Sequence, residues 1–442
     1  MNSIKRTFNE LFKYPSAVAG LIIILLLIAL SIYTLIALPY DRAISLWRGE
    51  SKDWYASPKY AMPAWINSFR KNKLPTTIIL KTDDPSVVKT EEKATVIYEM
   101  PFLFTADAFP SEINVFFKST YTSSPPFVGL SLITPDEREI KLGNFKVERS
   151  LAYYLSQDQK LVKKYKDIPI QEALLMQPDS KPRKPLKGTY KLIIEGVTFD
   201  EGSTVSAEAV FYGKVSGIAG TDHKRRDLSI ALLWGTPIAL MFGLVAAVGT
   251  SLTQLIISAI STWFGGWIDV LIQRITNVNM VLPFLPILIM IGTFYSRSIF
   301  VILTCVILLS IFGAGILTYR AMFMQIKESP YIEASRSYGA SNSRIIFKYM
   351  VPRLIPMLIP GFVSLIPSYV FLESSLAILG LGDPTIPTWG KVIDESYNSG
   401  ALFNGYYYWV LEPSFLLVVT GLAFAVVGYA LDRVFNPRLR GQ

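Results

Sequence analysis

Six long stretches with almost no charged residues constrain the fold of this chain more than any other feature. The first, Ser16–Leu38, holds 23 residues without a charge, enough for a helix to cross roughly 30 Å of hydrocarbon. It is longer than the apolar core of a signal peptide, and no small-residue cleavage pattern follows it, so we expect a retained anchor. Five further spans are expected at about residues 232–262, 271–294, 298–320, 354–380 and 411–432. The sequence therefore predicts a polytopic α-helical membrane protein with six transmembrane helices.

Between the first and second spans the chain becomes polar and rich in proline over roughly 180 residues, which is the size of an independent domain. Short runs of β-branched and aromatic residues with partial alternation predict the strands of a β-sandwich-like domain inserted between helices 1 and 2. We expect strands at 76–80, 94–100, 113–118, 127–133, 188–199 and 204–213. The Lys and Gln content of Ser150–Tyr165 favours a helix inserted between strands.

The chain thus divides into residues 1–38, 39–219 and 220–442, and the charges around the spans predict its orientation. The connection 320–353, between the fourth and fifth spans, carries six Lys or Arg residues and two Glu residues. Basic residues also lie before the first span and after the last: Lys5, Arg6, Lys13, Arg433, Arg438 and Arg440. Because short loops rich in Lys and Arg stay inside, we expect both termini and 320–353 to be cytoplasmic and 39–219 extracellular. Lys224, Arg225 and Arg226 would then lie outside, which a long translocated domain permits.

The composition excludes several classes of function. The chain is 51% apolar and 17% charged, which is too apolar for an ordinary soluble protein. Its net charge of +9 is not concentrated in one basic and aromatic block, so we expect no nucleic-acid partner. Cys305 and His223 are the only residues of their types, which excludes an intrachain disulfide and makes metal sites and a Ser-His-Asp hydrolase unexpected. We therefore expect neither catalytic nor metal-ligating residues.

The connection between the fourth and fifth spans contains a pattern that predicts two short helices joined at a sharp bend. Ser329 is placed to cap a helix beginning at Pro330, and Gly339 is placed to end it in a left-handed conformation. A second helix is expected from near Ser341 to Pro352. Small residues and one exposed acid surround the bend: Glu333, Ala334, Ser335 and Ala340. Such an element is suited to docking a partner, although an amphipathic connector lying on the lipid headgroups has the same spacing.

Six residues within or near the predicted spans have both functional and structural interpretations. Glu373 lies in the fifth span, where a carboxylate either lines the translocation path or pins two helices together. Pro283 and Pro286 are expected to break the third span, and Pro360 and Pro367 the fifth, which is typical of gates but also of plain membrane helices. Trp389 follows the fifth span, either in a re-entrant segment near the pore mouth or as an interfacial anchor.

The bent segment resembles the EAA loop of ABC importer permeases. Glu333, Ala334, Gly339 and Pro352 match that pattern, whereas Ser335, Tyr349 and Val351 depart from it. Further segments, in the same order, resemble the C-type permease of oligopeptide and dipeptide importers. They are Pro39–Asp41, Gly220–Asp222 with Arg226 and Asp227, Gly265–Asp269 with Arg274, Leu282–Phe284, Leu372–Leu376, Leu379–Gly382, Pro387–Gly390 and Asn436–Arg440. Arg225 stands where the family usually has Gly, and Asn277 replaces a common Asp.

The resemblance implies a type I ABC importer-like fold in which Glu333, Ala334, Ser335, Gly339, Ala340 and Pro352 couple the permease to a cytoplasmic ATPase. It implies as partners a second permease, two nucleotide-binding ATPase subunits and an extracellular solute-binding protein, besides the lipid bilayer. No phosphate-binding loop occurs in the sequence, so ATP and Mg²⁺ are expected in the ATPase and no cofactor in this subunit.

The large domain at 39–219 is not part of the common pattern and resembles archaeal members, some of which carry sugars. The solute is therefore expected among oligopeptides, dipeptides and oligosaccharides. An alternative from another class is a membrane-anchored receptor or adhesion protein that binds through its β domain. It accounts for the domain, but not for the bent segment.

Overall fold

The computed structural model describes residues 10–49, 52–82, 86–90, 93–166, 168–200 and 202–435. Lys5, Arg6, Arg438, Arg440 and the segment Asn436–Arg440 lie outside these residues. The chain forms two compact units. One is the β unit, Gly49–Ser229, and the other is the membrane unit, which combines Met1–Arg48 with Ile230–Gln442.

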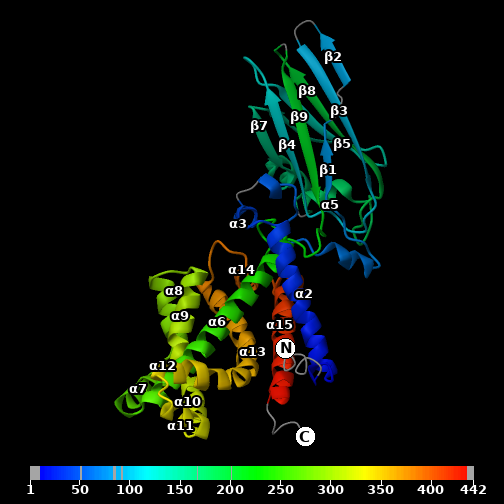
Figure 1. Cartoon of the computed structure of the whole chain (residues 1–442). Helices are drawn as coiled ribbons and strands as arrows, with labels where there is room; N and C mark the ends of the chain where they lie inside the picture. The colour runs from blue at the N-terminus through cyan, green and yellow to red at the C-terminus, as the bar shows by residue number, and fades with distance from the viewer. Residues whose placement is uncertain are drawn as a thin grey trace. The chain divides into compact units, whose positions relative to one another are not determined.

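The β unit is built from two antiparallel sheets (Figure 1). In the four-stranded sheet the order is β1 (Ile78–Lys81), β9 (Thr204–Tyr212), β4 (Glu112–Thr120) and β7 (Ser150–Tyr154). In the five-stranded sheet it is β2 (Ser86–Thr90), β3 (Lys93–Phe104), β8 (Gly188–Thr198), β5 (Phe127–Ile133) and β6 (Glu139–Lys146). The six predicted strands are confirmed, whereas β2, β6 and β7 were not predicted.

Large apolar side chains from both sheets form one shared core. The ring of Phe102 on β3 lies 4.4 Å from that of Phe211 on β9 and 5.4 Å from that of Tyr190 on β8. β8 and the first part of β9 alternate between buried and outward positions, which is the pattern that predicted these strands. The helix predicted for Ser150–Tyr165 is wrong in its first part, because Ser150–Tyr154 pairs with β4 as an edge strand.

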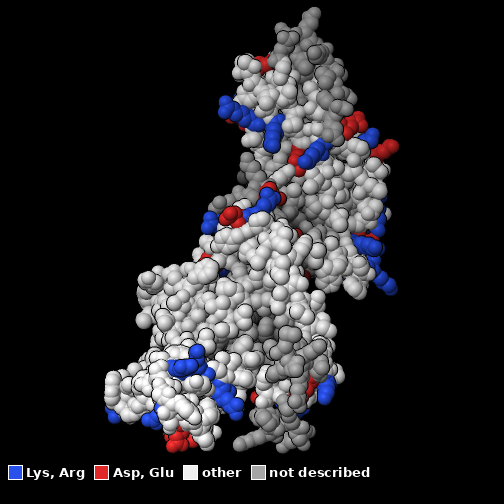
Figure 2. Space-filling view, viewed as in Figure 1, with Lys and Arg blue, Asp and Glu red and all other residues white. Residues whose placement is uncertain are grey.

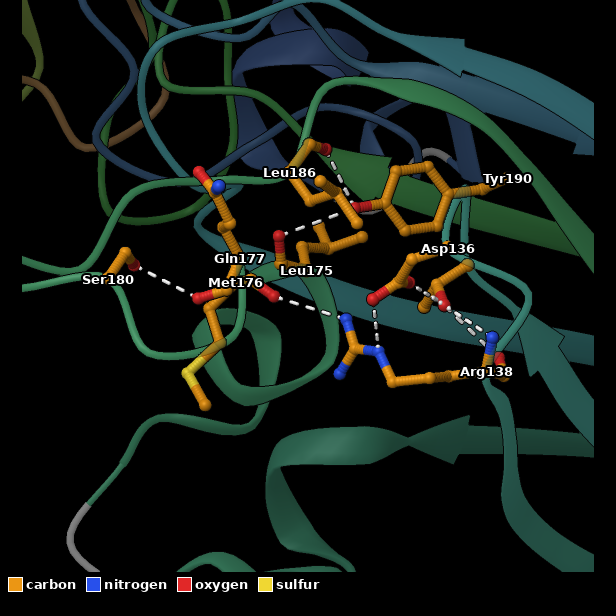
Figure 3. A network of polar contacts seen from close by, with 9 residues as sticks. Asp136, Arg138, Leu175, Met176, Gln177, Ser180, Leu186 and Tyr190 are labelled. Carbon is orange, nitrogen blue, oxygen red and sulfur yellow. Dashed lines mark hydrogen bonds and ion pairs between the residues drawn. The ribbon is translucent and has the colours of Figure 1, made fainter.

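Two short helices, α4 (Gln159–Tyr165) and α5 (Ile170–Leu175), interrupt the strand order between β7 and β8. Figure 3 shows how the end of this insertion is fastened to the strands. The hydroxyl of Tyr190 donates to the carbonyl of Leu186 at 2.8 Å, and Arg138 Nη2 donates to the carbonyl of Met176 at 3.3 Å. Burial raises the pKa of the Tyr190 hydroxyl, and the hydrogen bond from Arg138 lowers the pKa of Asp136.

The membrane unit is helical. Its elements are α2 (Pro15–Ala37), α3 (Tyr40–Arg48), α6 (Leu228–Phe264), α7 (Gly266–Val281), α8 (Phe284–Phe294), α9 (Ile299–Ile311), α10 (Ala314–Lys327), α11 (Pro330–Ser337), α12 (Asn342–Arg344), α13 (Val351–Leu376), α14 (Trp389–Asn398) and α15 (Tyr407–Phe435). Two wider π-helical turns, Ile345–Met350 and Ala377–Leu381, flank α13. Four continuous helical segments of the described chain are long and apolar enough to cross a membrane. The pairs α7–α8 and α9–α10 also qualify when each is taken together, with bends of 76° and 45°.

The prolines affect the helices differently from the prediction. Pro283 lies at the break between α7 and α8, as expected, whereas Pro286 is inside α8. The predicted breaks at Pro360 and Pro367 are wrong, because α13 continues through both. Packing explains this: Gly421 of α15 lets Phe371 and Pro367 approach closely, and the neighbouring helix holds α13 in place despite its missing hydrogen bonds.

We predict that the shared core is the main source of stability in the β unit. Phe102→Ala should lower the free energy of unfolding of this unit by about 3–5 kcal/mol, because Phe102 is 6% exposed and its removal leaves a cavity. Leu103→Ala, one residue further and 63% exposed, should change it by about 0.5 kcal/mol or less. Limited proteolysis of the purified chain along a denaturant series would measure both. Equal losses would contradict the prediction.

Candidate functional site

The predicted bend between the fourth and fifth spans is present as α11, a sharp turn and α12. Pro330 begins α11, and Ser329 before it is extended. The Ser329 side chain does not cap the helix as predicted, since its hydroxyl donates to the carbonyl of Ile326 instead. Gly339 ends α11 at φ 78°, and its N–H donates to the carbonyl of Arg336 at 2.9 Å. The short first helix and the glycine bend are therefore confirmed.

The second helix extends further than predicted. It does not end at Pro352 but continues from Asn342 through a π-helical segment into α13. Pro352 is the second residue of α13 and directly follows the π-helical segment, so it lies within this continuous helix. The bend is consequently joined, without a break, to the helix predicted as the fifth span.

One face of α11 is exposed and the other is anchored. Glu333, Ala334 and Gly339 are exposed, while Ser335 and Ala340 are half-buried. Ile332 is 1% exposed and belongs to an apolar cluster with residues of α6, α10 and α13, among them Leu255, Phe323 and Leu354. The small residues thus lie on a surface that a partner can approach, above a firmly packed base.

Lys327 and Arg336, which lie close to the bend in the sequence, contact the carboxyl end of α6. Lys327 Nζ donates to the carbonyls of Thr262 and Trp263, at 2.8 and 3.1 Å. These are among the last carbonyls of α6, which have no partner within the helix and carry its partial negative charge. The guanidinium of Arg336 on α11 lies 5.7 Å from the centre of the Trp263 ring. Sequence reasoning missed these contacts, because they join residues more than 60 positions apart.

A second network joins α6, α7 and α10. The Asp269 carboxylate accepts from Ser261 Oγ at 2.6 Å, from Gln273 Nε2 at 2.8 Å and from both Arg320 Nε and Nη2 at 2.7 and 2.5 Å. Such a two-pronged pairing of Arg with a carboxylate fixes orientation as well as distance. Figure 2 shows Lys and Arg side chains over the end of the membrane unit that carries α7, α10 and α11, below a surface with few charges.

Glu373 and Trp389, which were also predicted as site residues, both lie near the opposite end of α13. Glu373 is 7% exposed, and Ser374 Oγ donates to its carboxylate at 3.3 Å. Arg297 and Asp383 line the same small cavity as Glu373. Trp389, at the start of α14, is 1% exposed, and its Nε1 donates to the carbonyl of Leu232 on α6 at 2.9 Å. The ring of Trp389 therefore packs inside the unit rather than at its surface.

Arg225, which departs from the family pattern, lies in the β unit and has a left-handed backbone with φ 68°. This is a conformation that glycine adopts without strain. Its side chain donates to Glu112 on β4 at 2.6 Å and to the carbonyl of Ser57 at 2.7 Å, and it lies 4.2 Å from the centre of the Tyr212 ring. The arginine thus ties the segment before α6 to the four-stranded sheet.

Residues 239–441, which include the bend, the Asp269 network and Trp389, match the family described as the binding-protein-dependent transport system inner membrane component. This region of the chain belongs to that family. These residues accordingly form the permease part of the chain, and the match begins within α6.

Several permeases are similar to this chain. A dipeptide transport system permease protein, DppC, from Bacillus subtilis (strain 168) is 29% identical over 222 residues, covering 50% of this chain and 68% of the relative. The oligopeptide transport system permease protein OppC of Escherichia coli (strain K12) is 28% identical over 222 residues, covering 50% of this chain and 72% of the relative. A peptidoglycan transport system permease protein, YejE, from Agrobacterium fabrum is 29% identical, covering 50% and 56%. These relatives support the predicted permease and not the receptor or adhesion alternative.

The contact of Trp389 with α6 yields a test of helix packing. A Cβ atom at Gly235 of α6 would lie 2.2 Å from Trp389 Cδ1, so Gly235→Ala should force the two helices apart and lower the melting temperature of the permease in detergent. Gly361→Ala on α13 is the matched control, because no atom lies within 4 Å of its added methyl. The control should be neutral or stabilising by about 0.5–1 kcal/mol. A Gly235→Ala variant as stable as the control would disprove this packing.

Proposed function

We propose that this permease is one of two pore-forming subunits of an ABC importer, and that the bend at α11 couples it to a cytoplasmic ATPase. The observation that carries the proposal is the contrast between the two faces of α11. Glu333 and Ala334 are open to a partner, whereas Ile332 is buried against α6, α10 and α13. A push on the open face is therefore delivered to three helices at once.

The connection to α6 favours the same role. Lys327 and Arg336 hold the carboxyl end of α6, and the Asp269–Arg320 pair joins α6 to α7 and α10. Because packed interiors transmit displacement instead of absorbing it, movement of α11 is passed to the spans. ATP-driven closure of the ATPase pair would then switch the permease from an inward-facing to an outward-facing state.

The proposed topology has six spans, with α7–α8 and α9–α10 each crossing once as a bent pair. Both termini and the 320–353 connection are cytoplasmic, in agreement with the excess of Lys and Arg in that connection. The β unit is extracellular, inserted between the first and second spans. By function we divide the chain into three parts: a cytoplasmic N-terminus with the first span (1–38), an extracellular domain (39–219) and the core of the permease (220–442).

The proposed partners are a second permease, two ATPase subunits that bind ATP and Mg²⁺, and an extracellular solute-binding protein. This subunit then needs neither a cofactor nor a catalytic residue. Its solute belongs to the oligopeptides and dipeptides named for the relatives, or to the oligosaccharides. Glu373, Pro283, Pro367 and Trp389 either line the path or fix the helices around it. The β unit contacts the solute-binding protein or the second permease, with an advantage of local concentration because it is tethered to the pore.

The proposal is tested by co-purification. The tagged permease, expressed with the ATPase and second permease encoded nearest to its gene, should retain the ATPase on the affinity resin after detergent extraction. Glu333→Lys should reduce the retained ATPase, since the substitution changes an exposed side chain of α11 and no internal contact. Recovery of the second permease without any ATPase would contradict the coupling role.

The glycine at the bend permits a sharper prediction. Gly339→Val should lower uptake by about tenfold or more, because a β-branched residue at φ 78° costs roughly 1–3 kcal/mol and disturbs the bend. Gly339→Asn is the matched control, since Asn tolerates the left-handed conformation and no atom lies within 4 Å of an added Cβ. Solute uptake and membrane abundance should be measured together. Full uptake by a normally abundant Val variant would argue against a mechanical role for the bend.

A further inference from the structure

Three large apolar side chains are exposed side by side in the β unit. Trp65 is 52% exposed, Phe69 84% and Ile218 79%. The rings of Trp65 and Phe69 lie 6.2 Å apart, and Trp65 Nε1 donates to the carbonyl of Ile218 at 2.9 Å. We call these three residues the aromatic patch. Contiguous apolar surface of this kind is normally covered by a partner or by lipid.

The backbone beneath the aromatic patch is held in place. Met62 and Ala64 donate to the carbonyls of Lys214 and Gly217, each at 2.9 Å, and Ser216 donates back to Met62 at 2.8 Å. The amide of Asn67 closes the following loop through two hydrogen bonds with the backbone of Leu74, at 2.9 and 3.0 Å. The patch is therefore built into the fold of the unit.

Basic residues flank the aromatic patch. Arg70 and Lys71 follow Phe69 directly and are both exposed. Within the described part of the chain neither of them forms an ion pair. An amphipathic indole ring, a phenyl ring and neighbouring cations are the combination that proteins place at the boundary between lipid tails and phosphate headgroups.

The aromatic patch also lies next to the point where the chain enters a membrane helix. Ile218 is two residues from Gly220, whose carbonyl accepts from the N–H of Leu228 at 3.1 Å. Leu228 is the first residue of α6, which is apolar enough to span a membrane. The buried ion pair of Asp222 and Arg226, at 2.5 Å, closes the short loop between these residues. A short, hydrogen-bonded stretch of chain thus joins Ile218 to the first residue of α6.

We propose that the aromatic patch is a lipid-contact site of the β unit. Trp65, Phe69 and Ile218 enter the interfacial layer of the bilayer, and Arg70 and Lys71 bind anionic lipid phosphates. Lipid is favoured over a protein partner because Arg70 and Lys71 flank the patch without a carboxylate partner among the described residues, and because the chain continues directly into α6. The proposal goes beyond the transport role, and it holds whether or not α11 binds an ATPase.

The test uses the full chain in lipid nanodiscs. A spin label is placed at Phe69→Cys or Ile218→Cys in a Cys305→Ser background, since Cys305 is the only native cysteine. Phe199→Cys is the matched control. It is a 42% exposed aromatic just before the turn into β9, while the aromatic patch lies beyond the other end of that strand, roughly 30 Å away. Collision rates with oxygen, which concentrates in lipid, and with a water-soluble nickel chelate are compared.

Labels at both patch positions should collide several-fold more with oxygen, relative to the nickel chelate, than the label at the control position. Replacing phosphatidylglycerol by neutral lipid, or introducing Arg70→Gln with Lys71→Gln, should reduce this ratio at Phe69→Cys. Nickel access at the patch equal to that at the control would overturn the proposal. Shielding that appears only after a solute-binding protein is added would overturn it too, and would assign the patch to that protein.

Discussion

The proposed mechanism of this permease depends on one interaction, the hydrogen bonds from Lys327 to the carboxyl end of α6. A helix of 37 residues ends with unpaired carbonyls and a partial negative charge, and an apolar environment makes both costly to leave unsatisfied. Lys327 neutralises that end by binding the carbonyls of Thr262 and Trp263, and the Trp263 ring in turn receives Arg336 from α11. The capping requirement of α6 is thereby met by residues of α10 and α11. In the proposed mechanism the same contacts would also transmit movement from α11 to α6.

Close approach of small residues provides the stiffness that such transmission needs. Gly235 accepts the ring of Trp389, and Gly421 and Gly428 of α15 accept Phe371 and Ser364 of α13. In a bilayer, helices gain little from excluding water, so they associate through contacts of this kind. The bends fall where the packing allows them, at Pro283 between α7 and α8 and at Gly313 between α9 and α10. The remaining prolines, held between neighbours, leave α13 continuous.

The sequence was sufficient to predict elements whose signal is local. Apolar runs such as Ser16–Leu38 predicted helices, alternation predicted β4, β5 and β9, and the order of Pro330 and Gly339 predicted the bend. Edge strands such as Ser150–Tyr154 have too short a pattern to be separated from a helix, and pairing with β4 decides their structure. The prediction of breaks at Pro360 and Pro367 was wrong. A proline in the sequence indicates that one helical hydrogen bond is missing, but it does not indicate whether packing compensates for that loss. The Asp269–Arg320 and Lys327–Trp263 contacts join distant residues, and no spacing rule identifies such pairs.

Arg225 illustrates how a departure from a family pattern acquires a physical reason. A left-handed backbone at φ 68° costs an ordinary residue about 1–3 kcal/mol, which is why glycine suits the position. An arginine there gains a charged hydrogen bond to Glu112, a bond to the carbonyl of Ser57 and the face of Tyr212, and hydrogen bonds to charged groups contribute roughly 1.5–3 kcal/mol each. The strain is thus offset only if the four-stranded sheet is present to supply Glu112 and Tyr212. The four-stranded sheet therefore supplies the contacts that support an arginine in this left-handed conformation.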